Sequence, residues 1–146
     1  MGIDLGKKRI GIAMSDATGI LASPWGVIER SGEVALDHAE IKRVASDNDV
    51  EVIVVGIPVS MDGVERAVAI NSRSEAAAIG EIVGIPVRTC DERLSTVEAA
   101  RNLQQAGRST RQTRKPKAKS RTSIDASAAA VILQGWLETI HDGRGY

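Results

Sequence analysis

The stretch MGIDLGKKRIGIAM, residues 1–14, decides the fold. Its first six residues predict a short strand that ends in a turn at Gly6-Lys7-Lys8, and Arg9 to Met14 predict a second strand. The two strands form a hairpin. A third, irregular strand is expected over residues 20–28, interrupted by Pro24, because proline is tolerated in strands only at edges and bulges. The chain therefore begins with three antiparallel strands.

After residue 30 the pattern changes to helices that alternate with strands. Residues 33–47 carry apolar side chains at helical spacing, and residues 51–57 are a continuous β-branched run that is typical of a buried central strand. A helix, a strand and two more helices follow over residues 63–82, 85–89, 95–106 and 123–140, with Gly84 as a helix stop. The order βββαβαβαα predicts an α/β fold with a mixed five-stranded sheet, antiparallel in its first three strands and flanked by helices.

Composition points to one ordinary globular domain. The chain has 146 residues, of which 42% are hydrophobic and 26% are charged. It has no apolar run of the roughly 18 residues that a membrane helix needs, and no apolar signal region at its start. One cysteine, Cys90, excludes an internal disulfide and a multi-cysteine zinc site. We expect a single domain over residues 1–146, a cytoplasmic location, no membrane partner, and a monomer or homodimer.

The charges are distributed unevenly along the chain. The formal net charge is zero, but one segment holds seven bases and no acid: Arg108, Arg111, Arg114, Lys115, Lys117, Lys119 and Arg121. The rest of the chain then has 12 bases and 19 acids. Residues 107–122 also have no apolar pattern, and we expect a basic, mobile loop. On charge alone, a solvated loop and an arm that binds polyphosphate are equally good interpretations.

Three acids stand where strands end or helices begin: Asp4, Glu92 and Asp125. Taken singly, Asp125 is explained as a helix cap and Glu92 as part of a surface ion pair. Asp4 is harder to explain, because it interrupts an apolar strand where a lone carboxylate is costly. Three carboxylates that converge on one cleft would repel one another unless cations held them together. Ligands that are all oxygen favour Mg²⁺ or Mn²⁺.

The motifs that carry these acids belong to a set that covers the whole chain in order: Gly2–Gly6, Lys8–Gly11, Ser15-Asp16, Val55–Pro58, Met61–Gly63, Asp91–Thr96, Ile124-Asp125, Ala128-Ala129 and Ile132–Gln134. These motifs resemble those of the YqgF/RuvX family, whose members are described as Holliday junction resolvases and as nucleases that process the 5′ end of pre-16S rRNA. The resemblance implies an RNase H-like fold and a divalent-metal active site, with Asp4, Glu92 and Asp125 at the matching acidic positions.

We therefore expect a nuclease that works through two divalent metal ions and, as the resemblance implies, processes the 5′ end of pre-16S rRNA. Its expected partner is nucleic acid, either RNA or branched or single-stranded DNA. The bases expected to contact phosphates are Lys8, Arg9, Arg114, Lys115, Lys117 and Lys119. Two alternatives within this fold remain: a Holliday junction resolvase or DNA-repair nuclease, and a module that binds nucleic acid without cutting it. An actin-like ATPase or sugar kinase also begins with a Gly-Ile-Asp-Leu-Gly loop, but it needs a second domain for which 146 residues leave no room.

Overall fold

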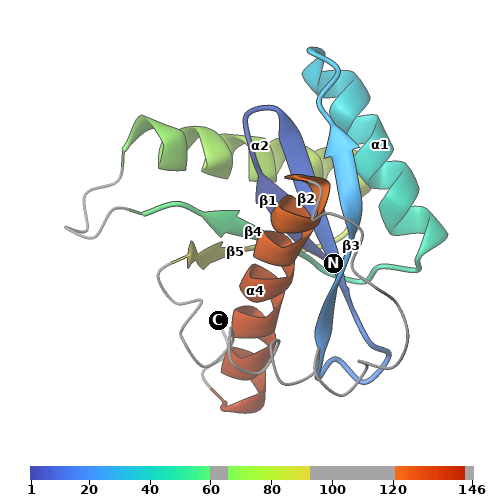
Figure 1. Ribbon diagram of the computed structural model, residues 1–146, viewed down its shortest axis with the longest axis vertical. Helices are drawn as coiled ribbons and strands as arrows, with labels where there is room; N and C mark the ends of the chain where they lie inside the picture. Colours follow the sequence, from blue (N-terminus) through green and yellow to red (C-terminus); the bar gives the residue numbers. More distant parts are fainter. Residues whose placement is uncertain (60–65, 93–120, 144–146) are drawn as a thin grey trace.

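The computed structural model describes residues 1–59, 66–92 and 121–143, with the backbone alone at 121–123. Its centre is a five-stranded sheet in the order β3-β2-β1-β4-β5 (Figure 1). Strand β2 is antiparallel to β1 and to β3, whereas β4 is parallel to β1 and to β5, so the predicted mixed sheet is confirmed. The strands are β1 (Gly2–Leu5), β2 (Arg9–Ser15), β3 (Ala22–Glu29), β4 (Ile53–Ile57) and β5 (Val87–Asp91).

Helices cover both faces of the sheet. Helix α4 (Arg121–His141) crosses one face, in front of the strands in Figure 1, and contacts β1, β2, β3 and β4. Helices α1 (Val34–Asp47) and α2 (Ala67–Val83) pack on the other face. Strand β4 is buried along its whole length because Ile53, Val55 and Ile57 face α1 and α2, whereas Val54 faces α4. This explains the continuous apolar run in the sequence.

Several element boundaries differ from the predicted ones. Strand β5 covers residues 87–91 rather than 85–89, because Pro86 has no N–H to donate and contributes only its carbonyl, which accepts from the amide of Ile53. The shift makes Glu92 the residue that directly follows the strand. Helix α4 begins at Arg121, so the last two residues of the expected loop 107–122 are helical.

Two boundary predictions hold. Helix α2 ends at Val83 and is capped by Gly84, which adopts a left-handed conformation with φ of 75° and donates its N–H to the carbonyl of Gly80. Pro24 lies opposite Ala13, beside a register shift between Ile12 and Ala13, and this irregularity accommodates the missing donor.

Other predictions fall outside the described residues: the helix over 95–106, the mobility of the basic loop, and the start of the second helix at 63–65. Among the helices that the structure does describe, none has the length and apolar character needed to cross a bilayer.

Candidate active site

Asp4 lies on β1, the central strand of the sheet, and its side chain is half-buried. Burial raises the pKa of its carboxyl group, and the negative charge of Asp125 raises it further. An acid in this position is therefore held where its ionised form is costly, which is typical of functional sites.

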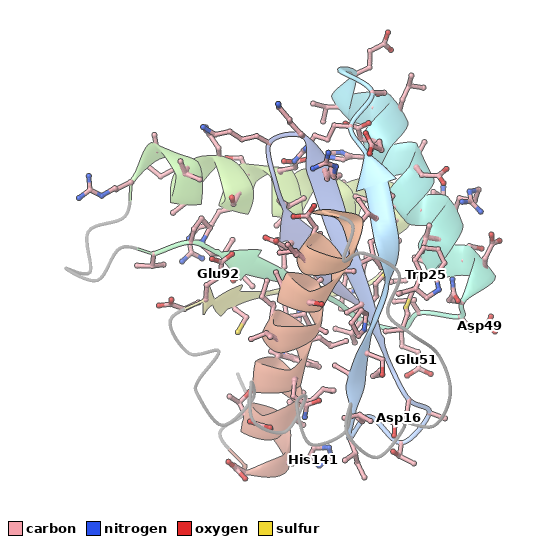
Figure 2. The ribbon with its side chains drawn as sticks, in the orientation of Figure 1. Asp16, Trp25, Asp49, Glu51, Glu92 and His141 are labelled. Atoms are coloured by element: carbon pink, nitrogen blue, oxygen red, sulfur yellow. The ribbon has the colours of Figure 1, made fainter. Side chains whose placement is uncertain are left out.

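Glu92 directly follows β5 and shares a pocket with Asp4. The pocket has a volume of about 300 Å³ and is walled on its third side by Ala128, Val131 and Ile132 of α4. Burial is the main cause that raises the pKa of Glu92, and the negative charges of Asp4 and Asp91 raise it further. Figure 2 shows Glu92 beside the first turns of α4, far from Asp16 and His141 near the other end of that helix. The parallel pairing of β1, β4 and β5 brings the two acids together, although they are distant in sequence.

Asp125 lies in the first turns of α4, next to Asp4 but not among the residues that line the pocket. Its Oδ2 is 4.0 Å from Nη1 of Arg9, and the two side chains are about one-third exposed, at 33% and 27%. Arg9 also approaches Glu29, with Nε 3.4 Å from Oε1. Arg9, expected to contact phosphates, therefore lies between two carboxylates at the rim of the site.

Two glycines that the sequence reasoning missed allow α4 to approach the sheet at this point. Gly11 is opposite Asp4 in the β1–β2 pairing, and a Cβ there would overlap the carbonyl of Asp125. A Cβ at Gly56 would overlap the side chain of Ile132 and lie 3.2 Å from Oε1 of Glu92. Glycine inside a strand marks a close approach of other atoms, and that was the available signal.

Asp4, Glu92 and Asp125 are neighbours, but they are not grouped tightly enough to form a ready-made metal site. In the described ranges 1–59, 66–92 and 121–143, no three Asp, Glu, His or Cys side chains stand close enough together to hold one metal ion. Asp4 is the shared neighbour, since its charge raises the pKa of Glu92 and it is itself affected by Asp125. Mutual repulsion keeps such groups apart, and a bound cation would reverse it. The donors are carboxylate oxygens, so the set suits a hard divalent cation such as Mg²⁺ or Mn²⁺.

The remaining predicted contacts with nucleic acid divide into two groups. Lys8 is exposed on the β1–β2 turn, close in sequence to Asp4. Arg114, Lys115, Lys117 and Lys119 lie outside the described residues.

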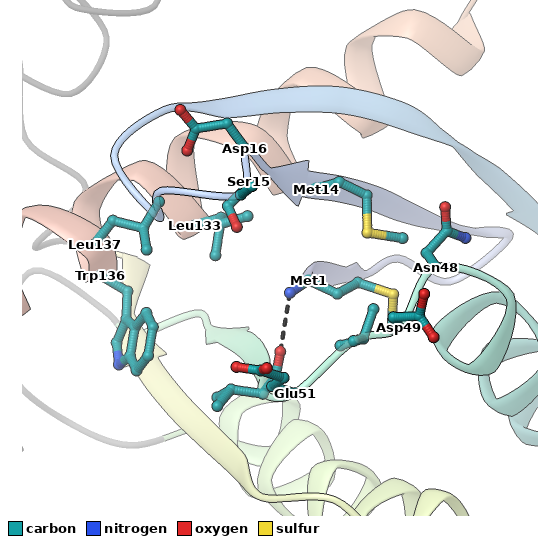
Figure 3. A pocket seen from close by; sticks show the side chains of 13 residues that line it. Met1, Met14, Ser15, Asp16, Asn48, Asp49, Glu51, Leu133, Trp136 and Leu137 are labelled. Atoms are coloured by element: carbon teal, nitrogen blue, oxygen red, sulfur yellow. Dashed lines mark hydrogen bonds between the residues drawn. The ribbon is translucent and has the colours of Figure 1, made fainter.

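A larger pocket of about 470 Å³ lies at the other end of β1 (Figure 3). Among the described residues that line it, the only basic group is the amino group of Met1, which donates to the carbonyl of Val52 at 2.9 Å. Burial lowers the pKa of this amino group to about 6. The rim of the pocket carries Asp16, Asp49 and Glu51. Hydrogen bonds from Thr18, Ile20 and Leu21 lower the pKa of Asp16, which therefore serves its own exposed turn. Burial instead raises the pKa of Asp4 and of Glu92, so their pocket is the better candidate for a functional site.

Comparison with known proteins identifies the family and the fold of the chain. The family model described as “RuvX: Holliday junction resolvase” matches residues 1–139. A protein of Anaeromyxobacter sp. (strain Fw109-5) is 41% identical over 141 residues, which are 97% of this chain and 97% of that protein. A protein of Myxococcus xanthus (strain DK1622) is 42% identical over 94% of this chain and 86% of that protein. Both are named “Putative pre-16S rRNA nuclease”.

Among solved structures, the fold is similar to that of RuvC from Thermus thermophilus, with a TM-score of 0.62 at 18% identity over 97% of this chain and 95% of that one. A second RuvC structure, in complex with a Holliday junction substrate, gives a TM-score of 0.64 at 19% identity over 97% and 94%. The expected RNase H-like fold is thus confirmed. Because the family model spans residues 1–139 and these relatives are more than 40% identical along almost the whole chain, the protein belongs to the RuvX family.

Proposed function

We propose that this protein is a divalent-metal-dependent nuclease that hydrolyses phosphodiester bonds, with the 5′ region of pre-16S rRNA as its substrate. The observation that carries the proposal is the pocket that Asp4 and Glu92 share, with α4 as its wall. Burial raises the pKa of both carboxyl groups, and the charge of Asp4 raises the pKa of Glu92 further. The names of the relatives supply the RNA substrate.

In this proposal the three carboxylates divide the work of holding the cations. Asp4 would be the shared ligand, because its charge acts on Glu92 and the charge of Asp125 acts on it, and Glu92 and Asp125 would complete the site. Bound Mg²⁺ or Mn²⁺ would supply Lewis-acid stabilisation of charge on the phosphate and would make the attacking water more acidic. Arg9 partly neutralises Asp125, which limits the repulsion felt by an approaching phosphate. Ala128, Val131 and Ile132 supply the apolar wall of the pocket.

Removal of the metal tests this proposal directly. With purified protein and an end-labelled RNA that carries the 16S 5′ leader, cleavage is expected in Mn²⁺ or Mg²⁺ and not in excess EDTA. Restoration by added Mn²⁺ would exclude irreversible damage by the chelator. Cleavage that continues undiminished in EDTA would disprove the metal mechanism, and binding without cleavage in any metal would favour the non-catalytic alternative.

The family description also makes a four-way DNA junction a candidate substrate. Cleavage of a synthetic junction and of the RNA leader should be compared at equal protein and metal concentrations. A higher kcat/KM on the RNA supports processing of pre-16S rRNA. A higher kcat/KM on the junction would replace that substrate with branched DNA while leaving the site unchanged.

The basic segment is proposed to bind the phosphate backbone of the substrate. Replacing Arg114, Lys115, Lys117 and Lys119 with Ser should weaken binding strongly at low salt, and the salt slope should fall by about 0.7 to 0.9 for every phosphate that the variant no longer binds. Thermal stability should change little, because the segment has no apolar side-chain pattern with which to pack on the core. Lys42→Ser with Arg43→Ser on α1 is the control and should leave the slope unchanged. Unchanged affinity and slope in the quadruple variant would show that the segment does not grip the substrate.

A further inference from the structure

Arg30, the residue after β3, makes an unusually complete set of hydrogen bonds. Its Nη1 and Nη2 donate to the two carboxylate oxygens of Glu75 on α2, at 2.8 and 3.1 Å. Its Nε donates to the carbonyl of Gly6 at 2.8 Å, and its backbone N–H donates to the carbonyl of Lys8 at 2.9 Å. The side chain is 17% exposed. Arg30 therefore joins α2 to two points of the β1–β2 turn.

The partner of Arg30 is itself held in place. His38 of α1, which is only 2% exposed, approaches Oε1 of Glu75 with its Nε2 at 3.1 Å. Burial would raise the pKa of Glu75, but the hydrogen bonds from Arg30 and His38 outweigh it and keep the pKa below its usual value. Asp37 lies 3.9 Å from Nη1 of Arg30 and accepts from the N–H and hydroxyl of Ser31. The guanidinium of Arg30 is therefore paired with an ionised Glu75, whose position on α2 is held by His38 of α1.

The turn that Arg30 holds lies between two residues of the candidate active site. The amide of Gly6 donates to the carbonyls of Asp4 and Arg9, at 3.1 and 3.0 Å. Asp4 precedes Gly6 by two residues, and Arg9 directly follows Lys8. The two carbonyls that Arg30 binds are therefore those of the turn that joins Asp4 to Arg9.

We infer that Arg30 is a positioning residue for the proposed nuclease reaction: anchored on Glu75, it clamps the β1–β2 turn and so fixes Asp4 and Arg9 relative to Asp125 and the pocket. The inference rests on the proposed function. Arg30 does not line the pocket and touches no reacting atom, so it acts only through the turn. A buried ion pair is in general weak evidence for a stabilising role, whereas a bidentate guanidinium supplies directional bonds that suit fixing a loop.

The test is Arg30→Gln, followed by amide hydrogen exchange and by cleavage kinetics. Exchange of the Gly6 amide should accelerate about tenfold, because the turn loses the hydrogen bond from the Arg30 guanidinium to the carbonyl of Gly6, while the backbone bond to Lys8 remains. The kcat in Mn²⁺ should fall by about 10- to 100-fold with KM little changed, since a small displacement of catalytic groups has effects of this size. Arg30→Lys should rescue part of the loss, because its ammonium can reach only some of the acceptors. It also serves as the test variant if Arg30→Gln does not fold.

Arg43→Gln is the matched control. Arg43 binds Glu40 and Asp47 with the same kind of guanidinium–carboxylate contacts, but on the exposed surface of α1. It should alter neither exchange at Gly6 nor kcat. Unchanged exchange at Gly6 in Arg30→Gln would overturn the clamp, and faster exchange with full kcat would overturn its role in positioning. A wild-type protein without cleavage would refute the proposed function, and the exchange rates alone would then decide whether Arg30 holds the turn.

Discussion

Asp4→Asn is expected to lower the cleavage rate by about a thousandfold or more while leaving affinity for RNA nearly unchanged. Asn keeps the shape of the side chain but has one neutral oxygen in place of a charged carboxylate. A metal ligand of this kind contributes several kcal/mol to the transition state, and about 1.4 kcal/mol corresponds to a tenfold change in rate. Single-turnover cleavage with saturating protein measures the chemical step, and filter binding or anisotropy measures the affinity.

Asp49→Asn is the matched control for this substitution. Asp49 is exposed beside the pocket at the other end of the sheet, and its φ of 51° is a conformation that Asn also tolerates. The cleavage rate of Asp49→Asn should equal that of the wild type. A fully active Asp4→Asn variant would remove Asp4 from the mechanism.

Asp4→Asn should also be more stable than the wild type in metal-free solution at neutral pH. The folded-state pKa of Asp4 is raised, so at neutral pH its ionised form is disfavoured by folding and costs stability. As the pH falls through this raised pKa, folded Asp4 becomes protonated and the cost disappears, so the difference in Tm should narrow. Mn²⁺ should raise the Tm of the wild type more than that of Asp4→Asn. Equal Tm values of the two proteins at every pH and metal concentration would contradict this electrostatic account.

Gly11→Ala is expected to produce the largest loss of stability, about 3 kcal/mol, because it forces overpacking where the structure cannot easily yield. The new Cβ would overlap the backbone carbonyl of Asp125, so that either α4 or β2 must move. For a protein of this size, such a loss corresponds to a fall in Tm of about 10 °C. Cleavage should fall as well, because Asp125 is displaced from Asp4. Urea unfolding and the cleavage assay measure the two effects.

Gly26→Ala controls for the general effect of replacing a strand glycine. Gly26 lies on β3 opposite Ile12, and a Cβ there would meet no atom within 4 Å. Stability should be unchanged or slightly higher, since alanine reduces the freedom of the unfolded chain. If Gly11→Ala and Gly26→Ala unfolded at the same urea concentration, close packing of α4 on Gly11 would not be a feature of the protein in solution.

The amino-acid sequence alone was sufficient to predict the local elements and the mixed sheet. The hairpin, the buried strand β4 and the helices α1 and α4 each have a periodicity or a β-branched run that neighbouring residues establish among themselves. The same reasoning identified Asp4, because an acid inside an apolar strand conflicts with its surroundings. Glu92 and Asp125 were found by their position at element boundaries and by resemblance to a family.

Only the tertiary structure decided how these residues meet. The parallel pairing of β4 with both β1 and β5 brings Glu92 beside Asp4, and no local pattern records which strands pair. The two-residue shift of β5 depends on Pro86, whose carbonyl accepts from the amide of Ile53 in the preceding strand. The bonds of Arg30 to Gly6 and Glu75 join segments that are far apart in sequence. These features depend on contacts between distant segments, whose energies a single stretch of sequence does not contain.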